Sequence, residues 1–234
     1  MKLAVAELNS FYGQAHILFD VALEVGAGEV VALLGRNGAG KSTTFRSIVG
    51  LVAQRSGRIV FEGEDVSERP THAIVRAGLG YVPEERRIFT ELTVDENLEV
   101  GRQPPRSNAP HWTPDKLFTL FPNLGEMRRR NGGHMSGGEQ QMLTIARTLM
   151  GNPSLILLDE PSEGLSPKIV EQMANAILTM KREGVSILVS EQNLHFARLI
   201  SDRAYIIERG RVRFSGSIAE LDARPDIRDS FLAV

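Results

Sequence analysis

The sequence predicts a single α/β domain over residues 1–234, with a mainly parallel sheet, an N-terminal antiparallel β portion and an inserted helical subdomain at about 88–150. Three observations predict this fold. Short β patterns bounded by glycine occupy the first part of the chain. Helical patterns occupy the middle. In the last third, apolar strand patterns alternate with helical ones, which is typical of parallel sheets covered by helices.

The composition is that of an ordinary globular protein, with 42% hydrophobic and 24% charged residues. Lysine and arginine number 27 against 29 acidic residues, so no basic surface stands out and we expect no nucleic-acid partner. The absence of cysteine excludes disulfides and thiolate metal sites. Glu7 and Asn9 interrupt the N-terminus before an apolar segment of signal-peptide length, and the longest apolar runs have strand length. We therefore expect a cytoplasmic chain that does not itself cross a membrane.

The segment "GRNGAGKST" (35–43) lies between a strand-like run at 28–35 and a helical pattern. Its glycines allow the backbone to curl so that several N–H groups point at one anion, and the helix N-terminus adds its positive dipole end. Lys41 would reach the outer phosphates of a nucleotide, and the Ser42 hydroxyl would ligate Mg²⁺. An accidental glycine-rich turn is the alternative, but the full spacing between a strand and a helix favours a phosphate-binding loop, the P-loop.

The middle of the chain contains a strand-like run, a loop and a second glycine motif. "IVFEG" (59–63) predicts a strand, and four prolines in "RQPPRSNAPHWTP" (102–114) predict a surface loop. "HMSGGEQQMLTIARTLM" (134–150) predicts a helix, because its apolar residues recur at i, i+3, i+4 and i+7.

Ser136, Gly137 and Gly138 open this helix. A hydroxyl and two glycine amides at a helix N-terminus make a second anion site, although Ser136 could also be a plain helix cap. One nucleotide does not need two γ-phosphate sites on the same chain. We therefore expect the second site to serve a nucleotide held by another subunit.

"SLILLDEP" (154–161) reads as a strand that is buried on both faces of a parallel sheet. Asp159, at its carboxyl end, can hold Mg²⁺ through the water shell of the ion, and Glu160 can polarise a water that attacks the γ-phosphate. The alternative is that both acids merely cap the next helix. A helix closed by Gly184, a further strand and a hairpin turning at 209–210 follow.

Taken together, "GRNGAGKST", "MSGGE" and "LILLDEP" resemble the ATP-binding subunits of ABC transporters, and the resemblance runs along nearly the whole chain. Within that family, "SFYGQAHILFDVALEV", "GYVPEERRIFTELTVDENL", "DEPSEGLSP" and "VSEQN" are similar to the branched-chain amino acid importer group.

The resemblance implies an ATPase that uses ATP and Mg²⁺ to energise import through separate integral-membrane permease subunits. It implies a head-to-tail dimer with a second ATP-binding subunit, which is the same or a related chain. It also implies a surface near 84–92 that docks on the permease, an extracytoplasmic substrate-binding protein, and a peripheral location on the cytoplasmic face of the inner membrane.

Four residues take their expected roles from the resemblance. Tyr12 falls where the family places an aromatic ring against adenine, although from the residues alone it is a strand-edge residue. Glu84 stands where most of the family has the glutamine that touches Mg²⁺ and faces the membrane subunits, and a carboxylate also ligates Mg²⁺. Ser166 replaces the aspartate that is usual after the catalytic glutamate. Gln192 replaces the histidine that usually contacts the γ-phosphate, and its amide donates the same hydrogen bond without carrying a proton.

The expected site therefore has three parts. Glu160 and Gln192 would be catalytic, and Ser42, Asp159 and Glu84 would hold the metal. The nucleotide would be bound by Tyr12, Gly35, Asn37, Gly38, Gly40, Lys41, Ser42, Thr43, Ser136, Gly137 and Gly138.

Other classes of protein remain as alternatives. A P-loop kinase or phosphotransferase would have no use for "SGGE" at a helix N-terminus. A DNA-repair ATPase of the same superfamily would place a long coiled coil between Lys41 and Ser136, and no sustained heptads occur there. Within transport, urea or other amides and aromatic acids are the alternative cargoes.

Overall fold

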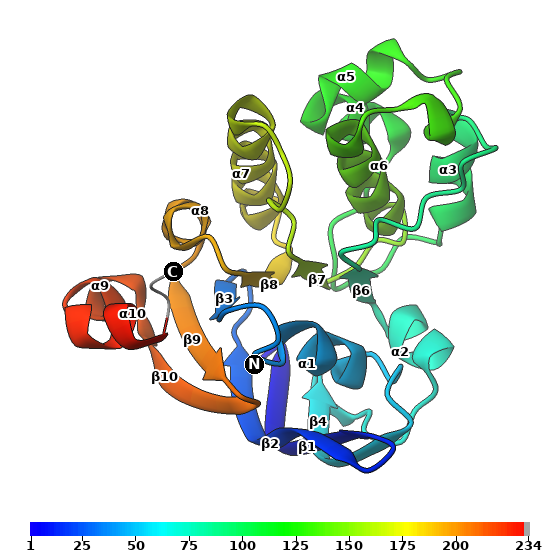
Figure 1. Ribbon diagram of the computed structural model, residues 1–234. Helices are drawn as coiled ribbons and strands as arrows, with labels where there is room; N and C mark the ends of the chain where they lie inside the picture. The colour runs from blue at the N-terminus through cyan, green and yellow to red at the C-terminus, as the bar shows by residue number, and fades with distance from the viewer. Residues whose placement is uncertain (232–234) are drawn as a thin grey trace.

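The computed structural model describes residues 1–231 and contains two sheets (Figure 1). Within these residues, six strands form a central sheet in the order β10-β9-β3-β8-β7-β6, and four form a second sheet in the order β2-β1-β4-β5. The strands are β1 (Leu3–Tyr12), β2 (Ala15–Val25), β3 (Val30–Leu34), β4 (Gln54–Phe61), β5 (Glu64–Asp65), β6 (Leu79–Val82), β7 (Leu155–Asp159), β8 (Ser186–Glu191), β9 (Arg203–Glu208) and β10 (Arg211–Ser217).

The central sheet is parallel except at one edge. β6, β7, β8, β3 and β9 all pair in parallel, and β10 pairs antiparallel with β9. Every residue of β3, β7 and β8 is buried, because helices or the second sheet cover both faces of these apolar strands. The predictions of a mainly parallel sheet and of an antiparallel N-terminal portion are confirmed.

The hairpin between β9 and β10 turns at Arg209 and Gly210, as predicted. Both residues have left-handed backbone conformations, with φ of 46° and 74°. A Cβ atom at position 210 would lie 1.8 Å from the carbonyl oxygen of Ile17 on β2, so only glycine fits this turn. The turn thereby holds the edge of the central sheet against the antiparallel sheet.

The helices are α1 (Lys41–Ile48), α2 (Thr71–Ala77), α3 (Val94–Gly101), α4 (Pro114–Leu120), α5 (Pro122–Glu126), the short 3₁₀ helix η1 (Gly132–His134), α6 (Gly137–Leu149), α7 (Pro167–Arg182), α8 (Leu194–Ile200), α9 (Ile218–Asp222) and α10 (Pro225–Phe231). Two cores form around the central sheet. Side chains of α1 and the antiparallel sheet pack on one face, and those of α3 to α8 pack on the other.

Figure 1 shows α3, α4, α5 and α6 gathered over the β7–β6 end of the central sheet, on the side away from α1. α6 packs on α3 and on β6, and its apolar residues share a core with the sheet. That these helices form a separate subdomain at 88–150 stays a prediction. Among residues 1–231, no helix combines the length and the apolar character needed to cross a membrane.

The loop between α3 and α4 differs in part from the surface loop that its prolines predicted. The side chain of Trp112 is buried, with 3% exposed. Asn152, also buried, fastens the loop: its Oδ1 accepts from the Trp112 N–H at 2.8 Å, and its Nδ2 donates to the carbonyls of Gln103 and Pro104 at 2.9 and 3.2 Å. The prediction is therefore wrong for Trp112, because its indole ring has a core to enter.

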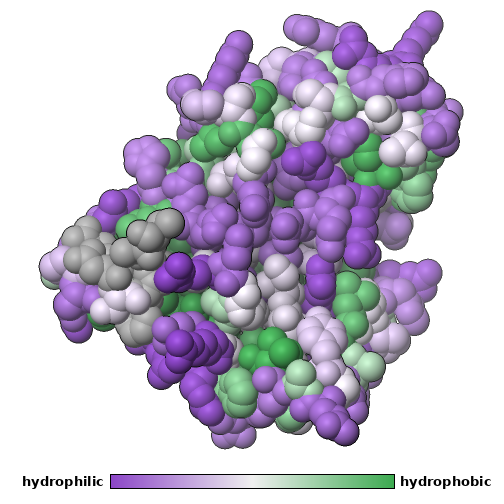
Figure 2. All heavy atoms as spheres, viewed as in Figure 1, coloured by the Kyte–Doolittle hydropathy of each residue, from purple (hydrophilic) through white to green (hydrophobic). Residues whose placement is uncertain are grey.

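One face of the molecule shows how apolar side chains are distributed on the surface. In Figure 2, hydrophilic side chains form a band across the middle, and apolar ones occur in separate small patches. Scattered apolar residues of this kind are normal for a folded domain.

Candidate active site

The P-loop connects β3 to α1, and its backbone requires glycine. Gly38 and Gly40 have φ of 78° and 112°, and a Cβ atom at Gly35 would lie 2.5 Å from the carbonyl oxygen of Ile207. α1 begins at Lys41, so the first N–H groups of the helix face the loop. This arrangement of left-handed glycines before a helix N-terminus is suited to phosphate.

Asp159 joins the P-loop to the centre of the sheet. Its carboxylate accepts hydrogen bonds from the hydroxyls of Ser190 at 2.6 Å, Ser42 at 3.1 Å and Tyr81 at 3.3 Å. Burial raises the pKa of Asp159, and the three hydroxyl donors oppose that rise. Hydroxyl and carboxylate oxygens are hard ligands of the kind that Mg²⁺ prefers, so the residues present fit this ion.

Glu160 follows directly and lies against Lys41. Its Oε1 is 2.8 Å from Lys41 Nζ, and its Oε2 is buried without a hydrogen-bond partner among the described residues. Burial raises the pKa of the Glu160 carboxyl, and the neighbouring Lys41 offsets only part of this rise. The backbone of Glu160 is left-handed, with φ of 49°, and Ser190 holds its N–H. A carboxylate oxygen with free lone pairs beside the lysine of the P-loop can orient a water for attack.

Lys41 does not extend into solvent. Its ammonium group also donates to the carbonyl oxygens of Gly35 at 2.7 Å and Arg36 at 3.1 Å. The ammonium group of Lys41, at the start of α1, thus links the P-loop to Glu160 after β7. These contacts bring together residues that are far apart in the chain.

β8 contributes a buried acid that the sequence analysis did not identify. The Glu191 carboxylate accepts from the N–H of Ser162 at 3.1 Å and from that of Asn193 at 3.4 Å, and burial raises its pKa to about 7. The carbonyl of Glu191 accepts from the Gly35 N–H at 3.2 Å. An acid at the carboxyl end of an apolar strand was the available signal, the same one that identified Asp159.

Two expected site residues lie near this edge of the sheet without entering the hydrogen-bond network. Gln192 is exposed, and its side chain makes no hydrogen bond with residues 1–231. Glu84 follows β6 and is exposed. Partial burial raises its pKa, and the negative charges of Asp159 and Glu160 raise it further, which places Glu84 in their electrostatic range.

The structure does not bring Ser136 or Tyr12 into contact with Lys41. Ser136 caps α6: its Oγ accepts from the Glu139 N–H at 3.4 Å, and Glu139 Oε2 accepts from the Ser136 N–H at 2.7 Å. Gly138 is packed so tightly that a Cβ atom would lie 2.9 Å from the side chain of Ile169. Tyr12 is half exposed at the end of β1, beside Arg46. Neither Ser136 nor Tyr12 forms part of the buried network.

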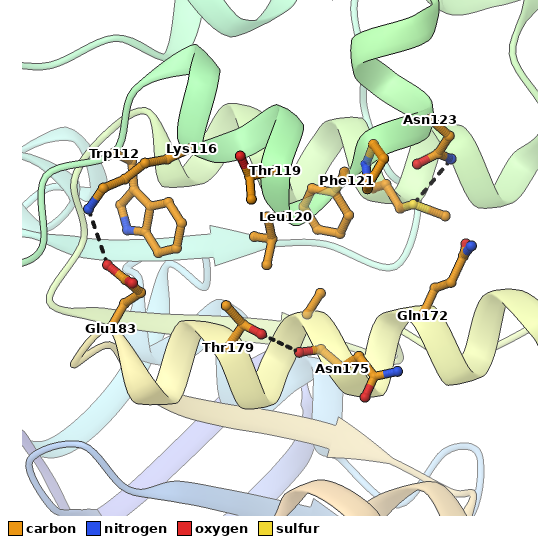
Figure 3. A pocket seen from close by; sticks show the side chains of 13 residues that line it. Trp112, Lys116, Thr119, Leu120, Phe121, Asn123, Gln172, Asn175, Thr179 and Glu183 are labelled. Carbon is orange, nitrogen blue, oxygen red and sulfur yellow. Dashed lines mark hydrogen bonds and ion pairs between the residues drawn. The ribbon is translucent and has the colours of Figure 1, made fainter.

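A cavity of about 560 Å³ lies between the α4–α5 region and α7 and contains none of the expected site residues (Figure 3). Leu120 and Phe121 form part of its apolar wall, and Lys116 bridges to Glu183 at 3.1 Å at one end. The candidate active site is therefore the polar edge where the P-loop meets β7 and β8, and not this cavity.

Comparisons with known proteins agree with that geometry. The family described as "ABC transporter" matches residues 18–163. The chain is 43% identical to the high-affinity branched-chain amino acid transport ATP-binding protein BraG of Pseudomonas aeruginosa, over 98% of this chain and 99% of the relative. It is 37% identical to the probable branched-chain amino acid transport ATP-binding protein LivF of Archaeoglobus fulgidus, over 94% and 93%. It is 38% identical to the lipopolysaccharide export system ATP-binding protein LptB of Haemophilus influenzae, over 93% and 91%.

Solved structures give the same result. A nucleotide-free ATP-binding cassette from an ABC transporter is similar with a TM-score of 0.82 and 26% identity, over 97% of this chain and 96% of that one. The ADP conformation of MJ1267, an ATP-binding cassette of an ABC transporter, is similar with a TM-score of 0.81 and 26% identity, over 97% of both chains. Because the family match spans more than half of the sequence and the relatives align over nearly all of it, this chain belongs to the ABC transporter family.

Proposed function

We propose that this chain is the ATP-hydrolysing subunit of an ABC importer for branched-chain amino acids. One observation carries the ATPase part: the phosphate-binding Lys41, the Ser42–Asp159 pair and the Glu160 carboxylate converge at the carboxyl edge of one parallel sheet. The cargo is supported by the 43% identity to BraG along almost the entire chain.

Each part of the site has its own task. The N–H groups of the P-loop and Lys41 bind the phosphates of ATP, and Tyr12 stacks on adenine. Ser42 and Asp159, together with Glu84, hold Mg²⁺, which neutralises phosphate charge when bound. Glu160 orients the attacking water and accepts its proton, while Gln192 donates a hydrogen bond to the γ-phosphate.

The second anion site acts across a dimer. Ser136 and the first amides of α6 bind the γ-phosphate of a nucleotide held by a second ATP-binding subunit, which is the same or a related chain. The exposed position of Ser136, away from the Lys41 network, supports this arrangement.

The permease docks at an apolar groove of about 410 Å³ between α2, β6 and α3. Val75, Phe89 and Val100 line it, and each exposes between 43% and 53% of its surface. Docking there places the chain at the cytoplasmic face of the membrane, with an extracytoplasmic binding protein delivering the cargo on the opposite side.

The ATPase part is tested with Glu160→Gln. The variant keeps the shape of the side chain but loses the base, so ATP binding should persist while turnover falls about 10²–10⁴-fold. An ATP-bound dimer should accumulate and be visible by size-exclusion chromatography. Glu163→Gln, an exposed change in the same loop, serves as the control and should hydrolyse ATP normally. Normal hydrolysis by Glu160→Gln would refute the assignment.

The cargo is tested by reconstituting the chain with its permease and binding-protein subunits in vesicles. ATP-dependent uptake of labelled leucine, isoleucine and valine is expected, with urea and phenylalanine as competitors. Preferential uptake of a competitor would move the assignment to another cargo and leave the ATPase role in place.

A further inference from the structure

The loop between β6 and α3 is strained, and it runs from the edge of the active site past the N-terminus of α6. The loop contains Glu84. Two residues further on, Arg86 and Arg87 have consecutive left-handed backbone conformations, with φ of 63° and 49°. Non-glycine residues adopt this conformation rarely, and strain of this kind concentrates at functional sites.

Side chains of α6 hold the strained backbone in place. Thr144 Oγ1 donates to the carbonyl oxygen of Arg86 at 2.8 Å, and the Arg147 guanidinium donates to that of Arg87 at 2.7 Å. The loop is thus attached to α6, while Glu84 in its first part lies within electrostatic range of Asp159 and Glu160.

The Arg86 side chain lies directly against the first residue of α6. A Cβ atom at Gly137 would be 2.5 Å from one terminal nitrogen of the guanidinium and 3.2 Å from its central carbon. Arg86 forms no ion pair within residues 1–231, and the neighbouring Glu85 pairs with Arg46 and Arg87. A cation without a protein counterion therefore lies beside the positive end of a helix dipole.

We propose that Arg86 is a further phosphate-binding residue, which contacts the γ-phosphate of the nucleotide held by the other subunit, beside Ser136 and Gly137. The proposal rests on the proposed function, since it needs ATP at a site shared between two subunits. A guanidinium is planar, permanently charged and able to donate two parallel hydrogen bonds to phosphate oxygens. It would also stabilise the charge that develops on the transferred phosphoryl group.

The proposal predicts different effects on the ATPase rate for substitutions of Arg86 and of the neighbouring Arg87. Arg86→Ala should lower the ATPase rate of the homodimer at least about tenfold and leave ATP binding by the monomer unchanged. Arg86→Lys, which keeps the charge, should recover part of the rate, and Arg86→Gln should not. Arg87→Ala is the matched control and should stay near the wild-type rate. Thermal unfolding of each variant checks that it folds. A near-normal rate in both Arg86→Ala and Arg86→Gln overturns the proposal.

Mixed dimers decide on which subunit's nucleotide Arg86 acts. Lys41→Ala and Arg86→Ala, each impaired alone, should gain activity over both parents when mixed, because one shared site then carries both faults and the other carries none. Arg86→Ala mixed with Ser136→Arg should stay as impaired as its parents, because each shared site keeps one fault. Suppose that the Arg86→Ala and Ser136→Arg mixture recovers while the Lys41→Ala and Arg86→Ala mixture does not. This reverse pattern would place Arg86 at the nucleotide held by its own chain and overturn the proposal.

A reference mixture of Lys41→Ala and Ser136→Arg tests the shared site itself. Recovery in this mixture is expected, and native gels should show mixed ATP-bound dimers. Failure to recover despite such dimers overturns the shared site, and the Arg86 proposal with it. Recovery in the reference together with the reverse pattern for Arg86 overturns the Arg86 proposal alone.

Discussion

Asp159, Glu160 and Glu191 are acids at the ends of β7 and β8, and burial raises the pKa of all three. Their partners differ. Asp159 accepts from three hydroxyls, Glu160 faces an ammonium group, and Glu191 accepts from two backbone N–H groups. One edge of the sheet therefore supplies a candidate metal ligand in Asp159, a candidate base in Glu160 and, in Glu191, an acid that accepts hydrogen bonds from the adjacent loops.

Glu191 should make the stability of the protein depend on pH. Its pKa rises from 4.5 to about 7 on folding, so between these values the native state holds a proton that the unfolded state has lost. Stability due to this proton is present below about pH 5 and is lost as the pH rises through 7, by about 3 kcal/mol in all. Urea unfolding of wild type and Glu191→Gln from pH 5 to 8 measures this loss.

The free energy of unfolding of wild type should fall relative to Glu191→Gln as the pH increases. The lost hydrogen bond in the variant shifts its curve by an amount that does not depend on pH, so only the difference in slope matters. The experiment is done without nucleotide and with EDTA. Parallel curves for the two proteins would show that Glu191 does not titrate in this range.

Next to Glu191, Gln192 has no proton to exchange near neutral pH. If the γ-phosphate contact is made by Gln192, the ionisable group closest to it along the chain is Glu191, whose pKa lies near 7. This adjacency would give the proposed γ-phosphate contact a titrating neighbour.

At the level of elements, the loop between α3 and α4 depends on Asn152. Its side chain makes hydrogen bonds to three backbone groups of the loop, and its own backbone is left-handed with φ of 50°. Asn152→Ala should lower the free energy of unfolding by about 3 kcal/mol, because these groups lose their partners and alanine tolerates this conformation poorly. Chemical denaturation measures the change.

Asn175→Ala is the matched control, since Asn175 is exposed on α7 and its side chain fastens no loop. It should change the free energy of unfolding by no more than about 0.5 kcal/mol. Equal stabilities of the two alanine variants would show that the loop does not need its anchor.

The elements themselves were largely predictable from the sequence. β3 and β7 are continuous apolar runs, and the P-loop motif is local, so neighbouring residues specify each of them. Contacts such as Lys41 to Glu160 or Arg86 to Gly137 depend on the order of strands in the sheet and on how α6 packs, which no local pattern encodes. Trp112 was missed for the same reason, because prolines mark a loop but do not show whether its aromatic residue finds a core.

For the whole molecule, docking of the permease at the proposed groove would be separate from ATP hydrolysis. The backbone of Phe89 is held on both sides by Asn97, at 3.0 Å in each case, so changing the side chain leaves the loop in place. Phe89→Asp should retain the ATPase rate of the isolated chain while co-purification with the permease and uptake of leucine are lost, because a charge then faces an apolar partner.

Leu199→Asp provides the control for this change. Leu199 is an equally exposed apolar residue on α8, with 51% of its surface accessible, and lies outside the groove. The Leu199→Asp variant should keep both the ATPase rate and the uptake of leucine. Normal uptake by Phe89→Asp, or equal losses in the two variants, would contradict docking at this groove.

The place of β3 in the sheet determines when the protein can fold during synthesis. β3 pairs with β8 on one side and with β9 on the other, although both strands are made much later than β3. A nascent chain leaving the ribosome therefore carries a wholly apolar strand with two unpaired edges until residues 186–208 have emerged. Long-range parallel pairing of this kind is slow and exposes aggregation-prone surface. Chaperone binding should accordingly peak on chains that stop short of β8, and ATP should protect only those that have passed β9.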